Sequence, residues 1–597
     1  MTFLYRLQLI ILTICCMERI TESLQIPLIP EKTFRTNMTI RRDRSRRASR
    51  RNGDNNNSSS SSSQRHSTMD SDTSALWPVV SDAGMNGDNE DGEEYDKTEE
   101  EALSKVFDSI IKIHATHSEP DYTMPWQRQH QTTSTSSGFV IRIPEMGMRV
   151  MTNAHSVEYG SIIQVQKRGD ENKYEAVVES IANECDLALL RVESTEFWNG
   201  LQELQFGTLP TLQDEVEVLG YPTGGDSLSI TSGVVSRIEM QEYTQADTHL
   251  LAIQIDAAIN SGNSGGPVVD YEYNIVGVAF QALEKAENIG YVVPVTVVQH
   301  FLQDIAKHGK YTGFCAIGTR LALLENKTFR SYLNMREKQS GVMIRKLDPT
   351  SPSSELLKEK DVIMCVDNIS VANDGKIPFR PGERVSLACY VQTKFKGDIM
   401  KFDILRDGNE MTLDVPIGIS KRLVRAHWDD KPPPYLIVGG LVFTALSVPF
   451  LYAVDAWNGY ISDNISYLLG LAHNQLEQPN DEIVVLAQVL AHSDNLGYDK
   501  YSDLHLVKFN DEKVRSLKHL KTLLDDSKND KFAKFEFAPD GRTVIMERSK
   551  LDSVTDDICS EHTIPNSFVL HDWDDDDNKK KATNGEDGHQ QEKAAAE

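Results

Sequence analysis

Ser264 lies in a short glycine-rich turn that suits a catalytic nucleophile. The segment GNSGGP, residues 262–267, follows the apolar run AIQIDAAI and precedes VVDYEYNIVGVAF. Gly262 and Gly265 allow the sharp bend at which backbone N–H groups converge on a developing oxyanion. We expect the N–H groups of Gly262 and Ser264, joined by that of Asn263, to form this oxyanion hole. A serine hydroxyl is a weak nucleophile by itself, so a base and an orienting carboxylate must lie elsewhere in the chain.

Two residues upstream of Ser264 have the types that this chemistry needs. His155 ends the strand-like run MRVMTNAH, and Asp186 stands directly before the apolar run LALL in the segment CDLALL. Taken singly, His155 would be an ordinary loop histidine and Asp186 a turn residue at the start of a strand. In the order His, Asp, Ser, each at a strand edge of an all-β scaffold, they predict a catalytic triad of the chymotrypsin type.

The strand that follows the nucleophile is expected to line the primary specificity pocket. This strand contains Val278, Ala279 and Phe280, and the segment Ala258-Ile259-Asn260 is expected on the facing wall. None of these residues is a carboxylate that could pair with a lysine or arginine side chain, so the pocket should prefer Val, Ala, Ile or Leu. The alternative is that Val278 and Phe280 belong only to the barrel core, because alternate residues of a strand face opposite ways.

The elements that must position these residues are short strands. Between residues 106 and 290 the chain contains eleven β-branched or alternating runs, bounded by Gly, Asn, Asp or Pro and without a long helical pattern between them. This pattern predicts a mainly β fold, either a double barrel or a sandwich. The apolar periodicity of residues 294–309, with Pro near the start and Gly at the end, predicts a helix that closes the domain.

Two further units follow, at residues 311–420 and 421–560, and each mixes strand and helix patterns. Helical patterns are expected at SSELLKE, residues 353–359, and at VRSLKHLKTLLDD, residues 514–526. The second contains an apolar stretch at 435–454 that is long enough for a transmembrane helix. Gly439, Gly440 and Pro449 divide it into strand-length pieces, so we expect strands there. A membrane-anchored adaptor that uses this stretch is the alternative.

Composition excludes several classes of function. With 62 Lys and Arg against 89 Asp and Glu, the net charge is -27, which disfavours nucleic-acid binding. The 7 cysteines form no C-x-x-C pair and no cluster with histidine at zinc spacing, so we expect no metal and no disulfide framework. The chain also lacks a G-x-x-x-x-G-K-[ST] motif, so the sequence predicts no cofactor and no ATP-driven activity.

The two ends of the chain differ from the body in composition. Residues 1–25 carry a short apolar run that predicts a secretory signal peptide rather than a buried helix. Residues 26–100 are rich in Arg, Ser and Asn and then acidic, and residues 561–597 are acidic, so both segments should be disordered. The signal predicts entry into the secretory pathway, with an endomembrane lumen or an organelle as the final compartment. The Arg-rich segment leaves a nuclear address as the alternative.

The motifs TNAH, CDLALL and GNSGGP, with GYPTGGDSLSITSGVVS between the last two, resemble the Deg/HtrA family of serine endopeptidases. Within it the chain is most similar to plant-type Deg proteases, in which a PDZ domain is followed by a second, degenerate PDZ-like domain. The resemblance implies a trypsin-like protease domain at 101–310, a PDZ domain at 311–420 and the PDZ-like domain at 421–560. It also implies His155 as base, Asp186 as orienting acid and Ser264 as nucleophile.

The resemblance further implies that the substrates are unfolded or damaged proteins and that the chain assembles into a homo-oligomer built on trimers. A peptide-binding loop of the PDZ domain would fall at residues 313–318, where the pattern GFCAIG is loose. Before the strand FVI the chain has Ser136-Ser137-Gly138 where Gly-Ser-Gly is more usual, which leaves the triad unchanged. The alternative function is a chaperone or peptide-binding scaffold whose protease domain is inactive or gated.

Overall fold

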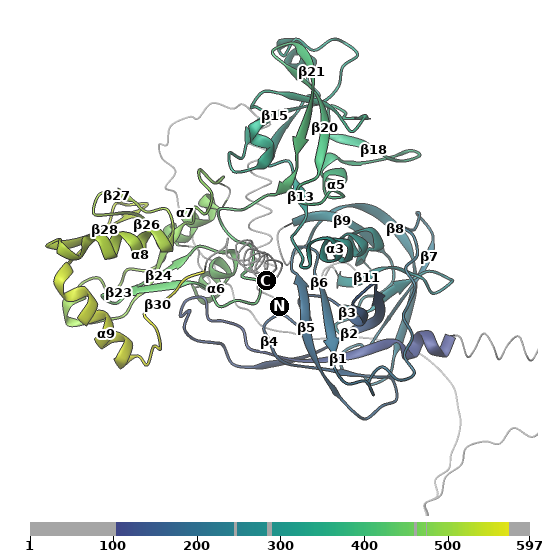
Figure 1. Cartoon of the computed structure of the whole chain (residues 1–597), viewed down its shortest axis with the longest axis horizontal. Helices are drawn as coiled ribbons and strands as arrows, with labels where there is room; N and C mark the ends of the chain where they lie inside the picture. Colours follow the sequence, from purple (N-terminus) through teal and green to yellow (C-terminus); the bar gives the residue numbers. More distant parts are fainter. Residues whose placement is uncertain (1–102, 244–247, 283–288, 459–461, 473, 572–597) are drawn as a thin grey trace, which may run out of the picture. The chain divides into compact units, whose positions relative to one another are not determined.

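The computed structural model describes residues 103–243, 248–282, 289–458, 462–472 and 474–571 (Figure 1). The predicted signal peptide, the segment 26–100 and residues 572–597 of the predicted tail lie outside the described residues. Residues 561–571, which were expected to be disordered, are described and include the end of α9 and strand β30, so the tail prediction is wrong for them.

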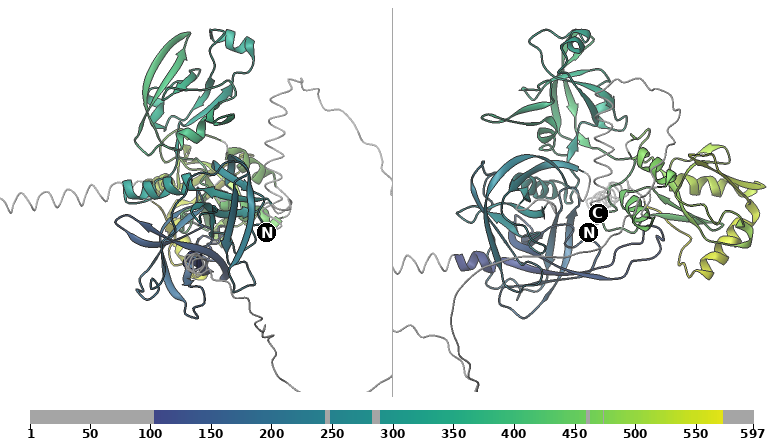
Figure 2. Two further views of the ribbon diagram at one scale, coloured as in Figure 1. Left: turned by 90° about the vertical axis from the view of Figure 1, so that its right-hand side faces the viewer. Right: turned by 180° about the vertical axis from the view of Figure 1, so that it is seen from behind.

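Two closed antiparallel barrels form the N-terminal part of the described chain (Figures 1 and 2). The first has the order β1-β2-β3-β6-β5-β4, with β1 Ile110–His117, β2 Thr132–Ile143, β3 Gly147–Thr152, β4 Gly160–Gln166, β5 Tyr174–Ala182 and β6 Leu187–Val192. The second has the order β10-β11-β12-β9-β8-β7, with β7 Glu215–Gly220, β8 Ser229–Tyr243, β9 Thr248–Ile255, β10 Pro267–Val269, β11 Ile275–Ala282 and β12 Gly290–Pro294. The double barrel expected from the strand pattern is therefore confirmed.

Each barrel is filled by the apolar residues of its own strands. Val140, Val150 and Leu190 are fully buried in the first barrel, and Val218 and Ile255 are fully buried in the second. The alternation of buried and more exposed residues along a strand places one set of side chains inside the barrel. Polar residues therefore lie mainly at the strand ends and in the turns between strands.

Helix α3, Val295–His308, follows the second barrel as predicted. Val298 and Phe301 of this helix are fully buried and belong to the core cluster that also contains Leu219 and Val278. The helix ends at Gly309, whose left-handed backbone (φ 73°) lets its N–H donate to the Ile305 carbonyl.

The middle domain spans β13 to β22 and contains a sheet with the order β14-β15-β16-β20-β21. Its elements are β13 Cys315–Ala316, β14 Thr319–Leu323, α4 Lys327–Tyr332, β15 Val342–Leu347, β16 Val362–Val366, β17 Ile369–Ser370, β18 Lys376–Arg380, β19 Glu383–Ser386, α5 Leu387–Val391, β20 Ile399–Arg406, β21 Asn409–Pro416 and β22 Gly418–Ile419. The helical pattern predicted near residue 354 forms only the short 3-10 helix η1, Pro352–Glu355.

The C-terminal domain is built on a sheet with the order β29-β28-β26-β25-β24-β23-β30. Its strands are β23 Tyr435–Val438, β24 Leu441–Ala445, β25 Val484–Val489, β26 Leu504–Phe509, β27 Glu512–Lys513, β28 Phe532–Ala538, β29 Thr543–Glu547 and β30 Phe568–Val569. Its helices are α6 Val448–Asn458, α7 Asp463–Leu471, α8 Leu517–Asp526 and α9 Leu551–Glu561. Helix α8 was predicted, whereas α9 was not.

The apolar stretch 435–454 forms a hairpin and then a helix. Gly439 and Gly440, with φ of 58° and 90°, make the turn between β23 and β24 as expected. The expectation of strands is confirmed as far as β24 and is wrong from residue 448 onward, because Pro449 lies in the first turn of α6, where a proline is tolerated. No helix among the described residues is long and apolar enough to cross a membrane.

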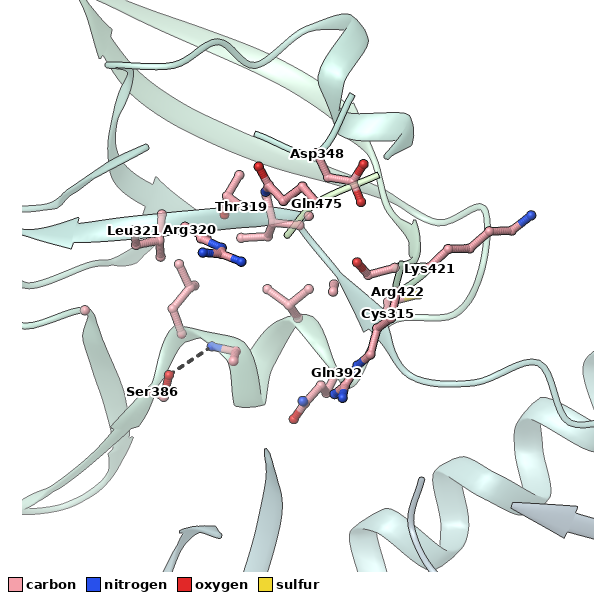
Figure 3. A pocket seen from close by; sticks show the side chains of 18 of the residues that line it. Cys315, Thr319, Arg320, Leu321, Asp348, Ser386, Gln392, Lys421, Arg422 and Gln475 are labelled. Carbon is pink, nitrogen blue, oxygen red and sulfur yellow. Dashed lines mark hydrogen bonds between the residues drawn. The ribbon is translucent and has the colours of Figure 1, made fainter. Parts of the chain in front are cut away.

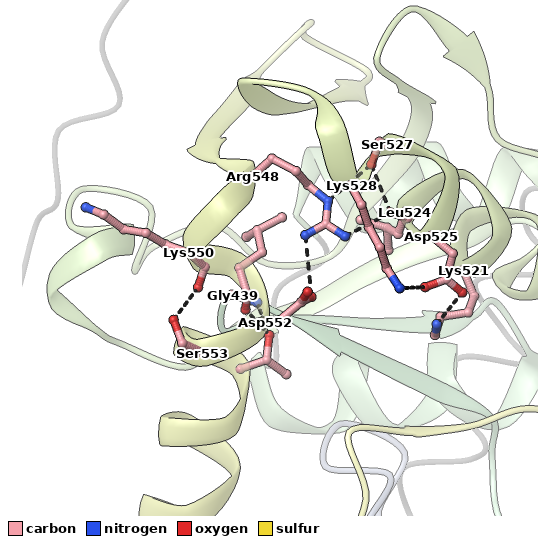
Figure 4. A network of polar contacts seen from close by, with 12 residues as sticks. Gly439, Lys521, Leu524, Asp525, Ser527, Lys528, Arg548, Lys550, Asp552 and Ser553 are labelled. Atoms are coloured by element: carbon pink, nitrogen blue, oxygen red, sulfur yellow. Dashed lines mark hydrogen bonds and ion pairs between the residues drawn. The ribbon is translucent and has the colours of Figure 1, made fainter.

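A buried arginine joins the helices of the C-terminal domain (Figure 4). Arg548 is 4% exposed, and its guanidinium donates to the Leu524 carbonyl (2.9 Å), to Ser527 Oγ (3.2 Å) and to Asp552 Oδ1 (3.4 Å). These partners lie at the end of α8, just after it, and in the first turn of α9. One side chain therefore fixes the two helices against each other.

Candidate active site

His155 and Asp186 form a hydrogen-bonded pair at the ends of two neighbouring strands. His155 Nδ1 lies 2.7 Å from Asp186 Oδ2, and the His155 N–H donates to Asp186 Oδ1 at 3.0 Å. Since the carboxylate only accepts, Nδ1 carries a proton and Nε2 is left with its lone pair. The side chain of Asp186 is 2% exposed and that of His155 is 29% exposed. The acid is therefore buried, while the imidazole reaches solvent.

Burial and Asp186 act on the pKa of His155 in opposite directions. Burial lowers it, but the attraction and the hydrogen bond of Asp186 raise it more, so the pKa lies above the ordinary value of 6.5. This environment favours the imidazolium that forms when a base takes a proton from a nucleophile.

Asp186 is held by a strained turn between β5 and β6. Its backbone is left-handed, with φ 54°, a conformation that Asp tolerates better than most residues. Asn153 Nδ2 donates to the Asp186 carbonyl at 2.8 Å, across from β3. Asn153 belongs to the TNAH motif, and its position two residues before His155 is the signal that could have identified it. This motif therefore supplies the base and also braces the acid.

The turn with Ser264 is fixed to the second barrel. The Gly265 N–H donates to the Ala279 carbonyl (2.8 Å), and the Ala279 N–H donates to the Gly266 carbonyl (3.0 Å), which extends the pairing of β10 with β11 up to Ser264. Gly262 and Gly265 have φ of 100° and 81°, and a Cβ at either position would collide with backbone atoms of neighbouring segments. Glycine is therefore required on both sides of the half-buried Ser264.

Ser137, which is fully buried on β2, connects this turn to the first barrel. Its N–H donates to the Ser264 carbonyl (3.0 Å), and its Oγ donates to the Gly262 carbonyl (2.7 Å). The same Oγ accepts the Tyr221 N–H (2.7 Å), and the Ser137 carbonyl accepts from Thr152 Oγ1 (2.8 Å). Ser137 lies in the segment Ser136-Ser137-Gly138, whose departure from the family pattern leaves the triad unchanged, and nothing local in the sequence marks Ser137 as the bridge.

The backbone around Ser264 leaves two N–H groups available for an oxyanion. The N–H groups of Gly262 and Ser264 have no acceptor within the part of the chain that the structure describes. The Asn263 N–H, in contrast, donates to the Asn260 carbonyl at 3.0 Å. Asn263 was expected to join the oxyanion hole, and this hydrogen bond occupies its N–H. Both hydrogen bonds found for His155 are to Asp186, so the structure contains none between His155 and Ser264.

The six residues expected in the specificity pocket lie in different environments. Val278 and Phe280 are in the core between barrels and helix α3, and Phe280 stacks on Tyr243 at 4.6 Å. Ala279 and Ile259 are buried together in the second barrel. Only the other two remain accessible, with Ala258 half-buried and Asn260 exposed. The arrangement of Val278 and Phe280 is the one that the core alternative describes.

The described cysteines and acidic residues form neither a disulfide nor a metal site. Five cysteines are free thiols, and no group of three or more His, Cys, Asp or Glu residues within the described ranges is arranged to hold a metal ion. Burial raises the pKa of Cys389 to about 11 and that of Cys315 to about 12, so both remain protonated thiols at neutral pH.

A cavity lies in the middle domain, between β14 and α5 (Figure 3). Its volume is about 520 Å³, and residues 315–318 of the predicted peptide-binding loop line one side together with Thr319. Ser386 caps α5 by accepting the Ala388 N–H at 3.3 Å. Residues 420–423 and Gln475 also line the cavity, which therefore extends past the middle domain.

Comparison with known proteins agrees with this architecture. A family model described as "Trypsin-like peptidase domain" matches residues 136–278, and one described as "PDZ domain" matches residues 424–569. The first match covers the segment that contains His155, Asp186 and Ser264. The second covers the C-terminal domain. The mainly β fold class, with protease and PDZ domains, is thus confirmed.

Several curated relatives match most of the chain. "Protease Do-like 2, chloroplastic" from Arabidopsis thaliana is 42% identical over 467 residues, which are 78% of this chain and 75% of the relative. "Protease Do-like 4, mitochondrial" from the same plant is 35% identical over 466 residues, which are 76% of this chain and 86% of the relative. The solved structure "HtrA-type protease AlgW with decapeptide" has 22% identity and a TM-score of 0.42, and covers 54% of this chain and 98% of that one. Because the Do-like relatives match over so much of both chains, this protein belongs to the plant-type Deg/HtrA family of serine endopeptidases.

Proposed function

We propose that His155, Asp186 and Ser264 form the catalytic triad of this endopeptidase. The observation that supports it most is the contact of 2.7 Å between His155 Nδ1 and Asp186 Oδ2. This contact leaves Nε2 able to accept the proton of Ser264 as the hydroxyl attacks the scissile carbonyl. His155 then returns the proton to the leaving amine, and Asp186 stabilises the imidazolium and fixes its tautomer. Hydrolysis of the acyl-enzyme repeats these steps with water as the nucleophile.

The oxyanion would be bound by the N–H groups of Gly262 and Ser264. Both lack an acceptor among the described residues, and two converging donors are enough for an oxyanion hole. We leave Asn263 out of this set because its N–H already donates to Asn260. Ser137 supports the turn, since its hydroxyl holds the Gly262 carbonyl and its N–H holds the Ser264 carbonyl, on either side of the Ser264 N–H.

The substrates are proposed to be unfolded or damaged proteins, degraded without ATP. An extended chain is needed because the scissile bond must reach a half-buried serine in a turn. The cavity beside β14 and α5 is proposed to take a peptide terminus, because a strand edge next to a helix is a common site for strand addition.

The triad is tested by the degradation of casein. The variant Ser264→Ala should lose nearly all activity. His155→Ala should lose a comparable amount, because the effects of substitutions within one catalytic unit are not additive. Ser261→Ala is the matched control, because Ser261 is an exposed serine of the same turn and should remain fully active. Substantial proteolysis by Ser264→Ala would refute the assignment. A folded wild type without activity, which still prevents aggregation, would favour the chaperone alternative.

The compartment is proposed to be an organelle. The names of the two Do-like relatives given above place them in the chloroplast and the mitochondrion. Imaging of a full chain with a C-terminal tag, beside the same chain lacking residues 1–30, tests this proposal. Organelle signal that depends on residues 1–30 would support it, whereas a secreted or nuclear full chain would contradict it. A homo-oligomer built on trimers is the proposed assembly, and mass photometry would measure it directly.

A further inference from the structure

The turn that follows His155 is contacted by the segment that leads into the C-terminal domain. Asp430 Oδ1 accepts the N–H of Tyr159 at 2.9 Å. His427 Nδ1 lies 3.3 Å from Glu158 Oε1 in the same turn. Tyr159 is only four residues after His155, so a contact between segments far apart in sequence reaches the immediate surroundings of the proposed base.

The backbone of this turn depends on that contact. Tyr159 is 8% exposed and has a left-handed backbone with φ 51°, which is unfavourable for a bulky residue. Its carbonyl accepts the Ser118 N–H at 2.9 Å, and its N–H donates to Asp430. Upstream, the Ala154 carbonyl accepts the N–H groups of residues 157 and 158, so His155 lies inside one compact turn. Asp430 therefore pairs the buried N–H at the far end of this turn.

Asp430 also has an unusual backbone of its own. Asp429 and Asp430 are both left-handed, with φ of 49° and 60°. Aspartate adopts this conformation more readily than most residues, and the two residues form a tight turn. The left-handed pair places the Asp430 carboxylate against Tyr159 while the Asp429 side chain is exposed.

A second segment contacts the same tyrosine. The segment between β1 and β2, residues 118–131, carries Tyr122, whose hydroxyl lies 3.2 Å from that of Tyr159. Tyr122 packs against both core clusters of the C-terminal domain. The next residue, Thr123, accepts at its carbonyl from Gln488 Nε2 (2.9 Å). Tyr159 is thus held on two sides by groups that belong to, or dock on, the C-terminal domain.

We propose that Asp430 is a positioning residue for His155, and that through it the C-terminal domain orients the catalytic base. This proposal rests on the proposed triad. Loss of the Asp430 acceptor would leave the Tyr159 N–H buried and unpaired, and the turn would relax toward a less strained backbone. The imidazole, which is fixed at its other side by Asp186, would tilt away from Ser264. Attack by the serine would then slow, while the binding of peptide would not change.

The test compares three variants of the full chain. Asp430→Gly removes the acceptor and tolerates the left-handed backbone. Asp430→Asn keeps an acceptor oxygen, and because burial raises the pKa of Asp430 to about 6, an uncharged side chain should be accommodated. Asp429→Gly is the matched control, since it replaces the adjacent left-handed aspartate by glycine in the same way but removes an exposed carboxylate. Each variant is assayed for kcat and KM on a peptide, and for its rate of labelling by a fluorophosphonate, which reports attack by Ser264 without peptide binding.

The expected results separate positioning from folding. Asp430→Gly should lower kcat and the labelling rate by about tenfold or more, with KM within about twofold of wild type. Asp430→Asn should restore both rates to within about threefold, and Asp429→Gly should match wild type. If Asp430→Gly fails to fold, Tyr122→Phe takes its place in the test. This variant removes only the Tyr122 hydroxyl that contacts the Tyr159 hydroxyl, and it must lower the labelling rate.

Three results would overturn the proposal. They are a wild-type labelling rate for Asp430→Gly, equal losses in Asp430→Gly and Asp430→Asn, and a loss that appears only in KM. A wild-type labelling rate for Tyr122→Phe would count against it in the same way if Asp430→Gly did not fold. Labelling of Ser264→Ala would show instead that the triad assignment itself is wrong, so the two failures are distinguishable.

Discussion

Tyr311 donates a hydrogen bond of 2.9 Å from its hydroxyl to Glu184 Oε2, two residues before Asp186. The same oxygen accepts the Phe314 N–H at 3.1 Å. Tyr311 and Phe314 lie between α3 and β13, in the connection to the middle domain. Burial raises the pKa of Glu184 in spite of these two hydrogen bonds. The turn of the proposed acid is therefore tied to the connection between the protease and middle domains.

Removal of the Tyr311 hydroxyl should loosen this turn. We expect Tyr311→Phe to lower the free energy of unfolding by about 1 kcal/mol, because a buried acceptor loses one of its two donors. The loosened turn also carries Asp186, so we expect kcat to fall. The fall should be less than about tenfold, because a tenfold change in rate requires about 1.4 kcal/mol. Thermal unfolding and peptide hydrolysis measure the two effects. Tyr332→Phe, at a site 80% exposed, is the control and should change neither. An unaltered melting temperature for Tyr311→Phe would contradict the expectation.

Two neighbouring buried serines should respond differently to the same substitution. Ser137→Ala removes the hydroxyl that bonds the Gly262 carbonyl and the Tyr221 N–H, and each buried group left unpaired costs about 1–3 kcal/mol. We expect a marked loss of stability and of kcat. Ser136 Oγ has no partner among the described residues, so Ser136→Ala should be neutral or stabilising. Denaturant unfolding of both variants gives the comparison, and equal effects would rule out the bridging role of Ser137.

The dependence of activity on pH should follow His155. Its pKa lies above 6.5, so the imidazole is still protonated at that pH, and activity should rise as the pH passes through the raised value. The pair with Asp186 contributes stability that is fully present below pH 6.5 and is lost as the pH rises through the pKa of the folded state. Asp186→Asn removes the attraction between the carboxylate and the His155 imidazolium. The rise of any residual activity with pH should therefore move to lower pH. Measured kcat/KM from pH 4 to 9 checks both, and a flat profile would point to another base.

Cleavage should occur mainly after Val, Ala, Ile or Leu. The two accessible residues of the expected pocket, Ala258 and Asn260, carry no charge, and an unpaired lysine or arginine is costly to bury. Mass spectrometry of the fragments of an unfolded protein maps the sites. The Ser264→Ala variant, digested in parallel, excludes a contaminating protease. A majority of cuts after Lys or Arg would show that a different wall forms the pocket.

The sequence allowed prediction of the parts of the fold that depend on local pattern. Alternation and glycine-bounded runs predicted the strands of both barrels, and the period of residues 294–309 predicted α3. The triad candidates follow from local patterns, because His155 and Asp186 stand at strand ends and Ser264 stands in a glycine-rich turn. The sequence could not show that Ser137 bridges two barrels or that Asp430 reaches Tyr159, since both contacts join segments far apart in the chain.

The specificity pocket shows a different limit. Alternation along β11 indicates that Val278 and Phe280 share a face, but it does not indicate whether that face meets a substrate or the core. In the structure α3 and Tyr243 cover the face that carries Val278 and Phe280. This packing joins segments distant in sequence, so local alternation cannot predict it. Helix α6 was missed for a related reason, because a proline that breaks a helix interior is compatible with a first turn.

The buried guanidinium of Arg548 couples α8 to α9 in the C-terminal domain. Its three partners belong to α8, to the segment after it and to α9, and Thr555 of α9 also accepts the Gly439 N–H at the turn before β24. Opening of α8 would deprive the buried guanidinium of its Leu524 and Ser527 acceptors, and opening of α9 would deprive it of Asp552. Amide hydrogen exchange should therefore show α8 and α9 opening together, with equal free energies. Such an opening would remove the support of Tyr122 and Tyr159, so under the proposal above the lifetime of the folded C-terminal domain would set how long His155, the proposed base, stays in place.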